Sequence, residues 1–164
     1  MFKDPHKAPK NYTPAEALPK IAAYCAYQER TQKEVEEKLR GYGLDEDESG
    51  EIIIRLSREK LLDEERYAQA YARGKHRANG WGRRRIRLEL KAKGLSEYCI
   101  KSGMKELEND EYYDKLKQLL GQRAAREKET HPLKRKMKLM AYLTQKGYES
   151  DLIQEALGEL SGSE

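Results

Sequence analysis

Apolar residues recur along this chain at the three- and four-residue spacing of an amphipathic α-helix. Leu18, Ile21 and Cys25 show this spacing near the start, and Leu116 and Leu120 show it again in the C-terminal third. No window alternates apolar and polar residues, or collects β-branched residues, in the way that a strand does. The pattern therefore predicts an all-α protein.

Capping residues mark the ends of the expected helices. Thr13-Pro14 supplies an N-cap followed by proline at the first helical position. Thr31, with Glu34 three residues later, forms a capping box for the second helix. Three further N-caps are expected, at Asp63, Ser96 and Ser150. The chain is thus divided into helices of moderate length joined by short turns.

The apolar pattern repeats with a period near 50 residues. Six apolar residues keep their place when the copies are shifted by 51 positions, as from 35 to 86, and then by 53, as from 86 to 139. These residues, the predicted core of the repeat, are Val35 and Leu39, Ile86 and Leu90, and Leu139 and Leu143. Such a period indicates units that complete one another's cores. We expect three tandem three-helix repeats in an elongated array.

The limits of the repeats follow from the caps and from helix ends that contain glycine. The predicted organisation is a flexible N-terminal tail (1–12), repeats at 13–62, 63–109 and 110–160, and a frayed C-terminus (161–164). In the first repeat, the acidic stretch 45–51 suits a helix N-terminus and a helix is expected over 52–62. The last helix is expected over 153–160.

One predicted helix is far more basic than the rest of the chain. Residues 74–94 contain eight Lys and Arg and one acid, an excess of +7, whereas the net charge of the whole chain is +4. On a helical wheel, Ile86 and Leu90 form one apolar stripe, Leu88 and Ala92 form a second, and a basic stripe lies between them. Two apolar stripes predict two packing partners for this helix.

The repeats provide an internal control for the basic stripe. It consists of Arg84, Arg87 and Lys91; the counterparts are Lys33, Glu36 and Arg40 in the first repeat and Met137, Met140 and Thr144 in the third. A solvated surface required by the scaffold would recur in every copy, whereas a binding surface can belong to one copy. A solvated surface stays open as the alternative, but the comparison favours binding.

Positive charge is concentrated in the C-terminal two thirds. Residues 115–146 contain ten Lys and Arg and two acids, whereas residues 1–60 hold eleven bases and twelve acids. Such a field attracts a polyanion or an acidic protein surface. Trp81 either packs in the core or stacks on a partner. The predicted binding face comprises Lys75, Arg77, Trp81, Arg83, Arg84, Arg87, Lys91, Arg123, Arg126, Lys134, Arg135 and Lys138.

The sequence offers no candidate catalytic, metal or cofactor site. Cys25 and Cys99 lack metal-ligand spacing and are interpreted as buried thiols, and the three histidines have no partner at ligand or triad spacing. There is no Gly-rich phosphate loop and no apolar run long enough to span a membrane. We expect a cytoplasmic, monomeric protein that is not an enzyme, uses no cofactor and does not contact a membrane.

Three motifs at the second repeat are specific enough to compare with known families. They are Leu62-Asp63-Glu64-Glu65-Arg66-Tyr67-Ala68, then Gly80-Trp81-Gly82 with Arg85-Ile86 and Glu89-Leu90, and finally Lys93-Gly94-Leu95. These motifs resemble the bacterial RecX family, regulators of the RecA recombinase. The chain departs mildly from the family pattern at Glu64, Tyr67 and Leu95. The resemblance covers about residues 18–160.

The resemblance implies a function as well as a fold. It implies three tandem three-helix units in an elongated, curved array that lies along a filament of RecA on single-stranded DNA. Members of the family limit filament growth and damp ATP hydrolysis, strand exchange and co-protease activity in DNA repair, recombination and the SOS response. They use no cofactor and catalyse nothing. The implied partners are the RecA filament and single-stranded DNA, with duplex DNA as an open alternative.

Two functional hypotheses therefore remain. In the first, the basic face of repeats two and three contacts a recombinase filament and nearby DNA, and the protein is a regulator. In the second, the protein binds DNA without RecA, in the manner of a helix-turn-helix protein. The second hypothesis would require polar base-reading residues such as Asn or Gln in one patch, and Arg84, Arg87 and Lys91 suit phosphate or carboxylate contacts instead.

Overall fold

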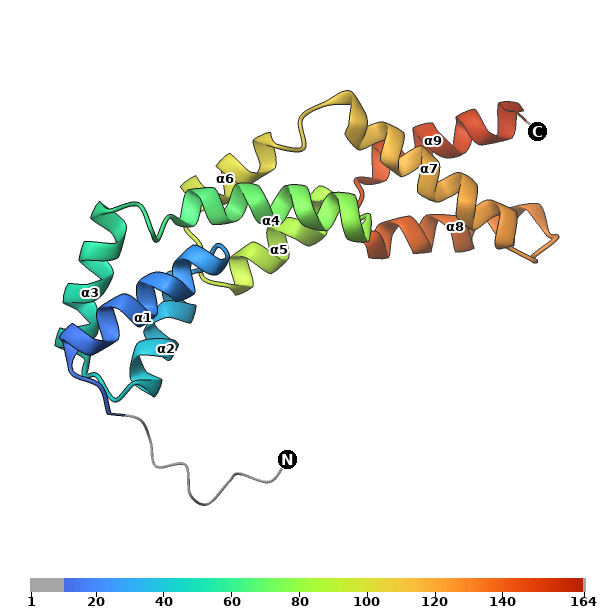
Figure 1. Ribbon diagram of the computed structural model, residues 1–164. Coiled ribbons are helices and arrows are strands. Elements are labelled where there is room, and N and C mark those ends of the chain that lie inside the picture. The colour runs from blue at the N-terminus through green and yellow to red at the C-terminus, as the bar shows by residue number, and fades with distance from the viewer. Residues whose placement is uncertain (1–10, 164) are drawn as a thin grey trace, which may run out of the picture. The chain divides into compact units, whose positions relative to one another are not determined.

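The computed structural model describes residues 11–163, and the predicted tail lies outside the described residues except for Asn11 and Tyr12. Within the described range the chain forms α-helices and no strands (Figure 1). The helices are α1 (Pro14–Tyr27), α2 (Gln32–Gly41), α3 (Glu46–Arg58), α4 (Glu64–Asn79), α5 (Arg83–Ala92), α6 (Glu97–Lys105), α7 (Asp110–Arg126), α8 (Pro132–Lys146) and α9 (Ser150–Ser163). The prediction of an all-α protein built from successive groups of three helices is confirmed.

Two compact units divide the chain, Met1–Tyr67 and Ala68–Glu164, and the boundary lies inside α4. In the first unit, α1, α2 and α3 pack on one another around a core in which Ala17, Ile21, Val35 and Leu39 are fully buried. Tyr12 does not belong to a free tail, because its N–H donates to the carbonyl oxygen of Tyr42 at 2.9 Å. The first helices of the array are therefore anchored from residue 12 onward.

Local capping explains where the helices of the first unit begin. Thr13 and Thr31 each accept a hydrogen bond from the backbone N–H three residues later, and the glutamate at that later position completes the capping box. Asp63 caps α4 in the same way through the N–H of Arg66, at 3.0 Å. These N-caps agree with the sequence predictions.

The acidic stretch 45–51 lies at the N-terminus of α3, as predicted, but the expected helix end at residue 62 was wrong. The helix begins at Glu46 because Asp45 accepts from the N–H of Glu48, which puts Glu46, Asp47 and Glu48 in the first turn. It ends at Arg58 because Lys60 adopts a positive φ of 58°. The N–H of Leu61 then bonds to Leu56, which closes the end of the helix at 2.9 Å.

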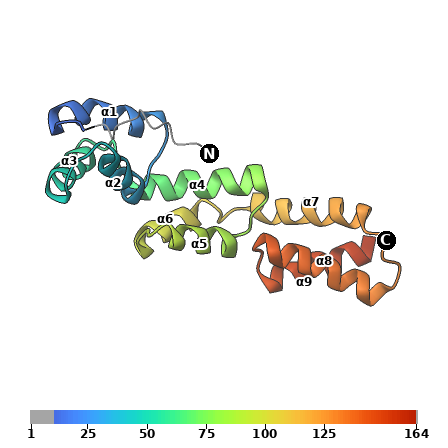
Figure 2. The same ribbon diagram turned by 90° about the horizontal axis from the view of Figure 1, so that it is seen from below.

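In the second unit, α5 packs on α6, and α7, α8 and α9 pack on one another (Figures 1 and 2). The predicted core residues of repeats two and three, Ile86, Leu90, Leu139 and Leu143, are at most 2% exposed. The last helix differs from its expected limits because Ser150 is its first residue and Glu149 precedes it, with the carbonyl oxygen of Glu149 accepting from Ile153. It also continues to Ser163, beyond the expected end at residue 160.

Candidate protein and nucleic-acid interface

Helix α5 carries the predicted basic stripe on its outer side. Ile86 and Leu90 are fully buried, and Arg84 and Lys91, on another side of the helix, are exposed. The guanidinium of Arg87 forms an ion pair with Glu97 at 2.6 Å, and both side chains are about half exposed. Among the described residues no ion pair involves Arg84 or Lys91. We refer to Arg84, Arg87 and Lys91 as the α5 surface.

The prediction of a second packing partner for α5 was wrong. Leu88 is 68% exposed, and Ala92 is also exposed. The apolar residues on this side of the helix are not covered by any described part of the chain, because α5 packs through the side that bears Ile86 and Leu90. The helix therefore presents cations and an exposed leucine together.

The first turns of α5 and α8 differ from those of the other described helices. Every other helix has an acid in its first turn, which interacts favourably with the positive end of the helix dipole. The first turns of α5 and α8 have no acid. Helix α5 instead begins with Arg83 to Arg85, and in α8 the bases Lys134 to Lys136 follow Pro132 and Leu133. Positive charge at this end of a helix is unfavourable for the helix dipole, and a nearby anion offsets it.

Arg83, by contrast, is held inside the chain. Its guanidinium pairs with Glu149 at 2.7 Å, donates to the carbonyl oxygen of Leu107 at 2.8 Å, and lies 3.8 Å from the centroid of the Tyr112 ring. These contacts engage both terminal nitrogens of the guanidinium, whereas its buried Nε has no hydrogen-bond partner among the described residues. Arg83 therefore ties α5 to the third repeat.

The indole of Trp81 also has internal partners. Arg85 lies over the ring at 4.1 Å and Lys75 at 5.1 Å, and Tyr71 meets it edge to face at 6.5 Å. The side chain is half buried. Arg77, on the preceding helix, is exposed. The contacts of Trp81 favour packing within the chain over stacking on a partner.

The predicted bases of the third repeat fall into two groups. Arg135 donates to the carbonyl oxygen of Ala124 at 3.1 Å and so caps the end of α7. Arg123 and Lys138 form ion pairs with the acids of the α7–α8 connection, at 3.6 Å and 3.5 Å respectively. Arg126 and Lys134 are exposed. The structure thus leaves two of these five bases exposed without an ion pair among the described residues.

A buried polar cluster that was not predicted from the sequence joins the second and third repeats. His76 stacks on Tyr112 with ring centroids 5.2 Å apart, and its Nδ1 lies 2.9 Å from the carbonyl oxygen of Trp81. The hydroxyl of Tyr112 donates to Glu149. Burial lowers the pKa of His76 and raises the pKa values of Tyr112 and Tyr148. The one available signal was Glu149, the first acid after a long basic stretch.

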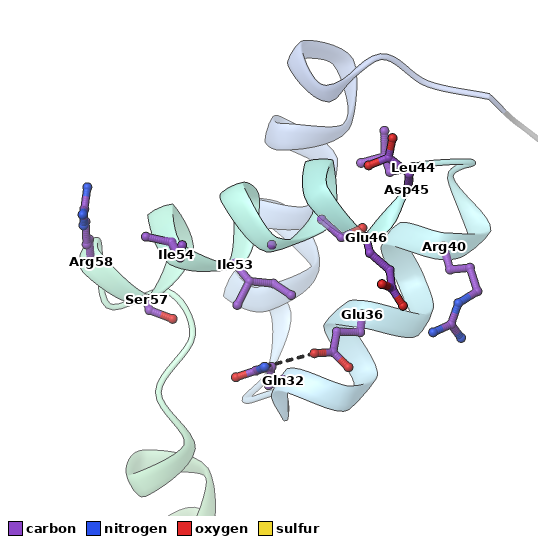
Figure 3. Close-up of a pocket in the computed structure, with 12 residues that line it drawn as sticks. Gln32, Glu36, Arg40, Leu44, Asp45, Glu46, Ile53, Ile54, Ser57 and Arg58 are labelled. Carbon is purple, nitrogen blue, oxygen red and sulfur yellow. Dashed lines mark hydrogen bonds between the residues drawn. The ribbon is translucent and has the colours of Figure 1, made fainter.

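The second and third helices of the first repeat enclose a groove of about 680 Å³ (Figure 3). A similar groove of about 420 Å³ lies between α5 and α6. The shift of 51 positions carries lining residues of one groove onto lining residues of the other: Gln32 onto Arg83, Glu36 onto Arg87, Ile53 onto Met104 and Ser57 onto Glu108. The groove therefore recurs with the repeat while its charge changes.

The described residues contain no cluster of side chains suited to a metal ion. No described helix is long and apolar enough to cross a membrane. Cys25 is buried, which raises the pKa of its thiol, and Cys99 is half buried.

Comparison with known proteins identifies the family. The model of the first three-helix domain of RecX matches residues 20–56, that of the second matches 63–104, and that of the third matches 110–157. A regulatory protein RecX of Bacillus cytotoxicus is 32% identical over 138 residues, which cover 84% of this chain and 51% of that protein. A regulatory protein RecX of Mycobacterium sp. (strain JLS) is 30% identical and covers 85% of this chain and 81% of its own length.

Solved structures agree with the family models. The crystal structure of RecX from Lactobacillus salivarius matches with a TM-score of 0.83 and 28% identity, over 90% of this chain and 96% of that one. A second crystal structure of a regulatory protein RecX matches with a TM-score of 0.80 and 25% identity, over 88% of this chain and 73% of that one. The chain spans about half the length of the first curated relatives it matches. On these matches, the chain belongs to the RecX family of regulatory proteins.

Proposed function

We propose that this protein binds the RecA recombinase filament and its DNA and modulates, mainly inhibits, RecA activity in recombination and DNA repair. The relatives are regulatory proteins by name, which supports a regulatory role, and RecA as the target comes from the family resemblance. The observation that carries the proposal is the α5 surface. It is exposed, basic and confined to the second repeat. We further propose that the protein acts in the cytoplasm as a monomer.

The cations of the α5 surface can exchange contacts within the chain for contacts with a protein or DNA partner. A surface ion pair such as that between Arg87 and Glu97 contributes only about 0.2–1 kcal/mol, so a carboxylate or phosphate of a partner can replace Glu97. Arg84 and Lys91 are exposed and have no ion pair to break among the described residues. Positive charge of this kind also accelerates encounter with an acidic filament.

The α5 surface can be tested by charge reversal. We expect the double variant Arg84→Glu, Arg87→Glu to lose at least about tenfold in inhibition of RecA, since charge-assisted contacts are worth about 1.5–3 kcal/mol each. Helicity and melting temperature should change little because both side chains are at the surface. The matched control is Lys101→Glu, Lys105→Glu, which reverses two exposed lysines on α6. Inhibition equal to the parent's would mean that the α5 surface is only solvated.

A second candidate function is DNA binding without RecA. The exposed cations Arg84 and Lys91 favour it, because DNA phosphates pair with Arg and Lys side chains. Binding to RecA filaments, free duplex and free single strands across a salt series separates the two functions. Tighter binding to the filament than to either free DNA supports the regulator. Equal or tighter binding to free duplex would favour the second function and reject the first.

A further inference from the structure

The third repeat contains its own groove between α8 and α9, of about 370 Å³. Its lining is mainly aliphatic and includes no acid; the residues are Pro132, Leu133, Arg135, Lys136, Leu139, Leu157, Leu160 and Ser161. Helix α8 carries five bases and no acid along its whole length. The groove thus combines an apolar floor with a strongly positive edge.

The corresponding groove of the second repeat contains an ion pair between a base and a carboxylate. The shift of 53 positions carries Arg83 onto Lys136 and Met104 onto Leu157, and all four line their respective grooves. In the second repeat, Arg83 holds the carboxylate of Glu149, which comes from outside that repeat, at 2.7 Å. In the third repeat, Lys136 occupies the same position and is exposed, with no ion pair among the described residues. The third repeat therefore has the base, Lys136, but no described residue supplies a carboxylate to pair with it.

Two differences make the third groove more apolar than the second. The position of Glu108 is taken by Ser161, which removes an acid. Helix α8 also begins one turn earlier than α5, and this extra turn adds Leu133 to the lining. Leu133 and, one turn further along, Met137 are each 61% exposed. Exposed aliphatic side chains beside a groove are typical of an interaction site.

We infer that the α8–α9 groove binds an acidic, aliphatic segment of a protein partner. Lys136 pairs with a carboxylate of the segment, while Leu133, Leu157 and Leu160 contact its aliphatic side chains. The groove has no aromatic side chain on which a base could stack, and leucines add nothing to a phosphate contact, so a nucleic acid fits it less well. This groove would give the regulator a second contact with its partner. The inference rests on the proposed function in one respect, namely that the partner is a protein that this chain regulates.

The groove can be tested with a peptide of known composition. The probe is a fluorescein-labelled amphipathic peptide of about 15 residues, long enough to form a helix, built from Leu and Glu. We expect it to bind the full chain and to perturb backbone NMR signals of α8 and α9. Binding should weaken at least about tenfold in Lys136→Glu and about fivefold in Leu133→Ser, as expected for loss of a charged contact and of an apolar contact.

Matched variants show whether these losses are specific. Lys101→Glu reverses an exposed lysine on α6, and Leu88→Ser removes a comparably exposed leucine on α5, so both should bind the peptide like the parent. Equal binding of a peptide in which Lys replaces Glu, or unchanged affinity in Leu133→Ser, would overturn the inference. So would a duplex oligonucleotide that displaces the peptide and binds with the same dependence on Lys136.

The two proposals fail in different ways. The variant Arg84→Glu, Arg87→Glu should keep its affinity for the peptide while it loses inhibition of RecA. If the peptide does not bind the parent although this variant loses inhibition, only the groove assignment is overturned. If the peptide binds at α8 and α9 although the variant still inhibits, only the role of the α5 surface is rejected.

Discussion

Helices α2 and α5 hold the same place in successive repeats, yet only their inner sides are alike. Val35 and Leu39 in α2, like Ile86 and Leu90 in α5, are fully buried. The N-termini differ, because α2 is closed by the capping box of Thr31 whereas α5 begins at Gly82 with no side-chain cap. The buried side of each helix is therefore the same in both repeats. The exposed side and the N-terminus differ because different segments of the chain contact them.

The neighbour of the α5 N-terminus is the turn between α8 and α9. The N–H groups of Gly82 and Arg84 donate to the carbonyl oxygens of Lys146 and Gly147, at 2.8 and 3.0 Å. These backbone acceptors replace the capping side chain that α2 obtains from Thr31. The φ of Gly82 is −82°, which any residue adopts, so glycine is required here for space.

The first and largest test of this comparison is Gly82→Ala. A Cβ at this position would lie 2.4 Å from the carbonyl carbon and oxygen of Gly147, so the turn must move and its two hydrogen bonds weaken. We expect a loss of about 3 kcal/mol in the free energy of unfolding of the second unit, the size of an overpacked contact with lost hydrogen bonds. Urea denaturation followed by the fluorescence of Trp81, the only tryptophan, measures it.

Gly74→Ala is the matched control for this change. Nothing lies within 4 Å of a Cβ at Gly74, which is inside α4, so the substitution should stabilise the helix by up to about 1 kcal/mol. If Gly82→Ala is as harmless as Gly74→Ala, the N-terminus of α5 does not depend on the α8–α9 turn, and the contrast with α2 fails.

The second test concerns the side chain that α5 obtains from the next repeat. Glu149→Gln keeps the shape of the residue but removes the charge that pairs with Arg83 and accepts from Tyr112. We expect a loss of about 2 kcal/mol, less than for a fully buried pair because both charged side chains keep some exposure to water. Trp81 fluorescence in urea again reports it. Glu108→Gln, an exposed acid of the same groove, should change the stability by less than about 0.5 kcal/mol.

Features set by neighbouring residues in sequence were predictable. The N-caps at Thr13, Thr31, Asp63 and Ser96 follow from side chains that reach N–H groups only two or three residues away. The buried positions follow from the helical period together with the internal repeat. Neither requires knowledge of how distant segments meet.

Features set by distant segments were not predictable. Arg83 belongs to the predicted binding face by its position in the sequence, but Glu149, far along the chain, holds it inside the second unit. Arg135 is likewise removed from the predicted face by the end of α7. Leu88 shows the reverse, because its helical position predicts burial and no described element covers it. A helical wheel gives the side of the helix on which a side chain lies, but it does not show whether another element packs against that side.

The smallest effect is expected at the N-terminus of α2, the other helix of the comparison. Thr31→Ala removes the hydroxyl that accepts from the N–H of Glu34 at 3.1 Å and leaves the reciprocal contact of Glu34 weaker. Because the contacts between Thr31 and Glu34 are local, and the N–H of Gln32 keeps its hydrogen bond to Glu64, we expect a loss of only about 1 kcal/mol, measured by circular dichroism in urea. Thr13→Ala, the same capping box at a more exposed site, should lose about half as much or less, since water can replace the hydroxyl there. A loss in Thr31→Ala that equals that of Gly82→Ala would show that both N-termini depend on long-range packing, and the two helices would then differ in charge alone.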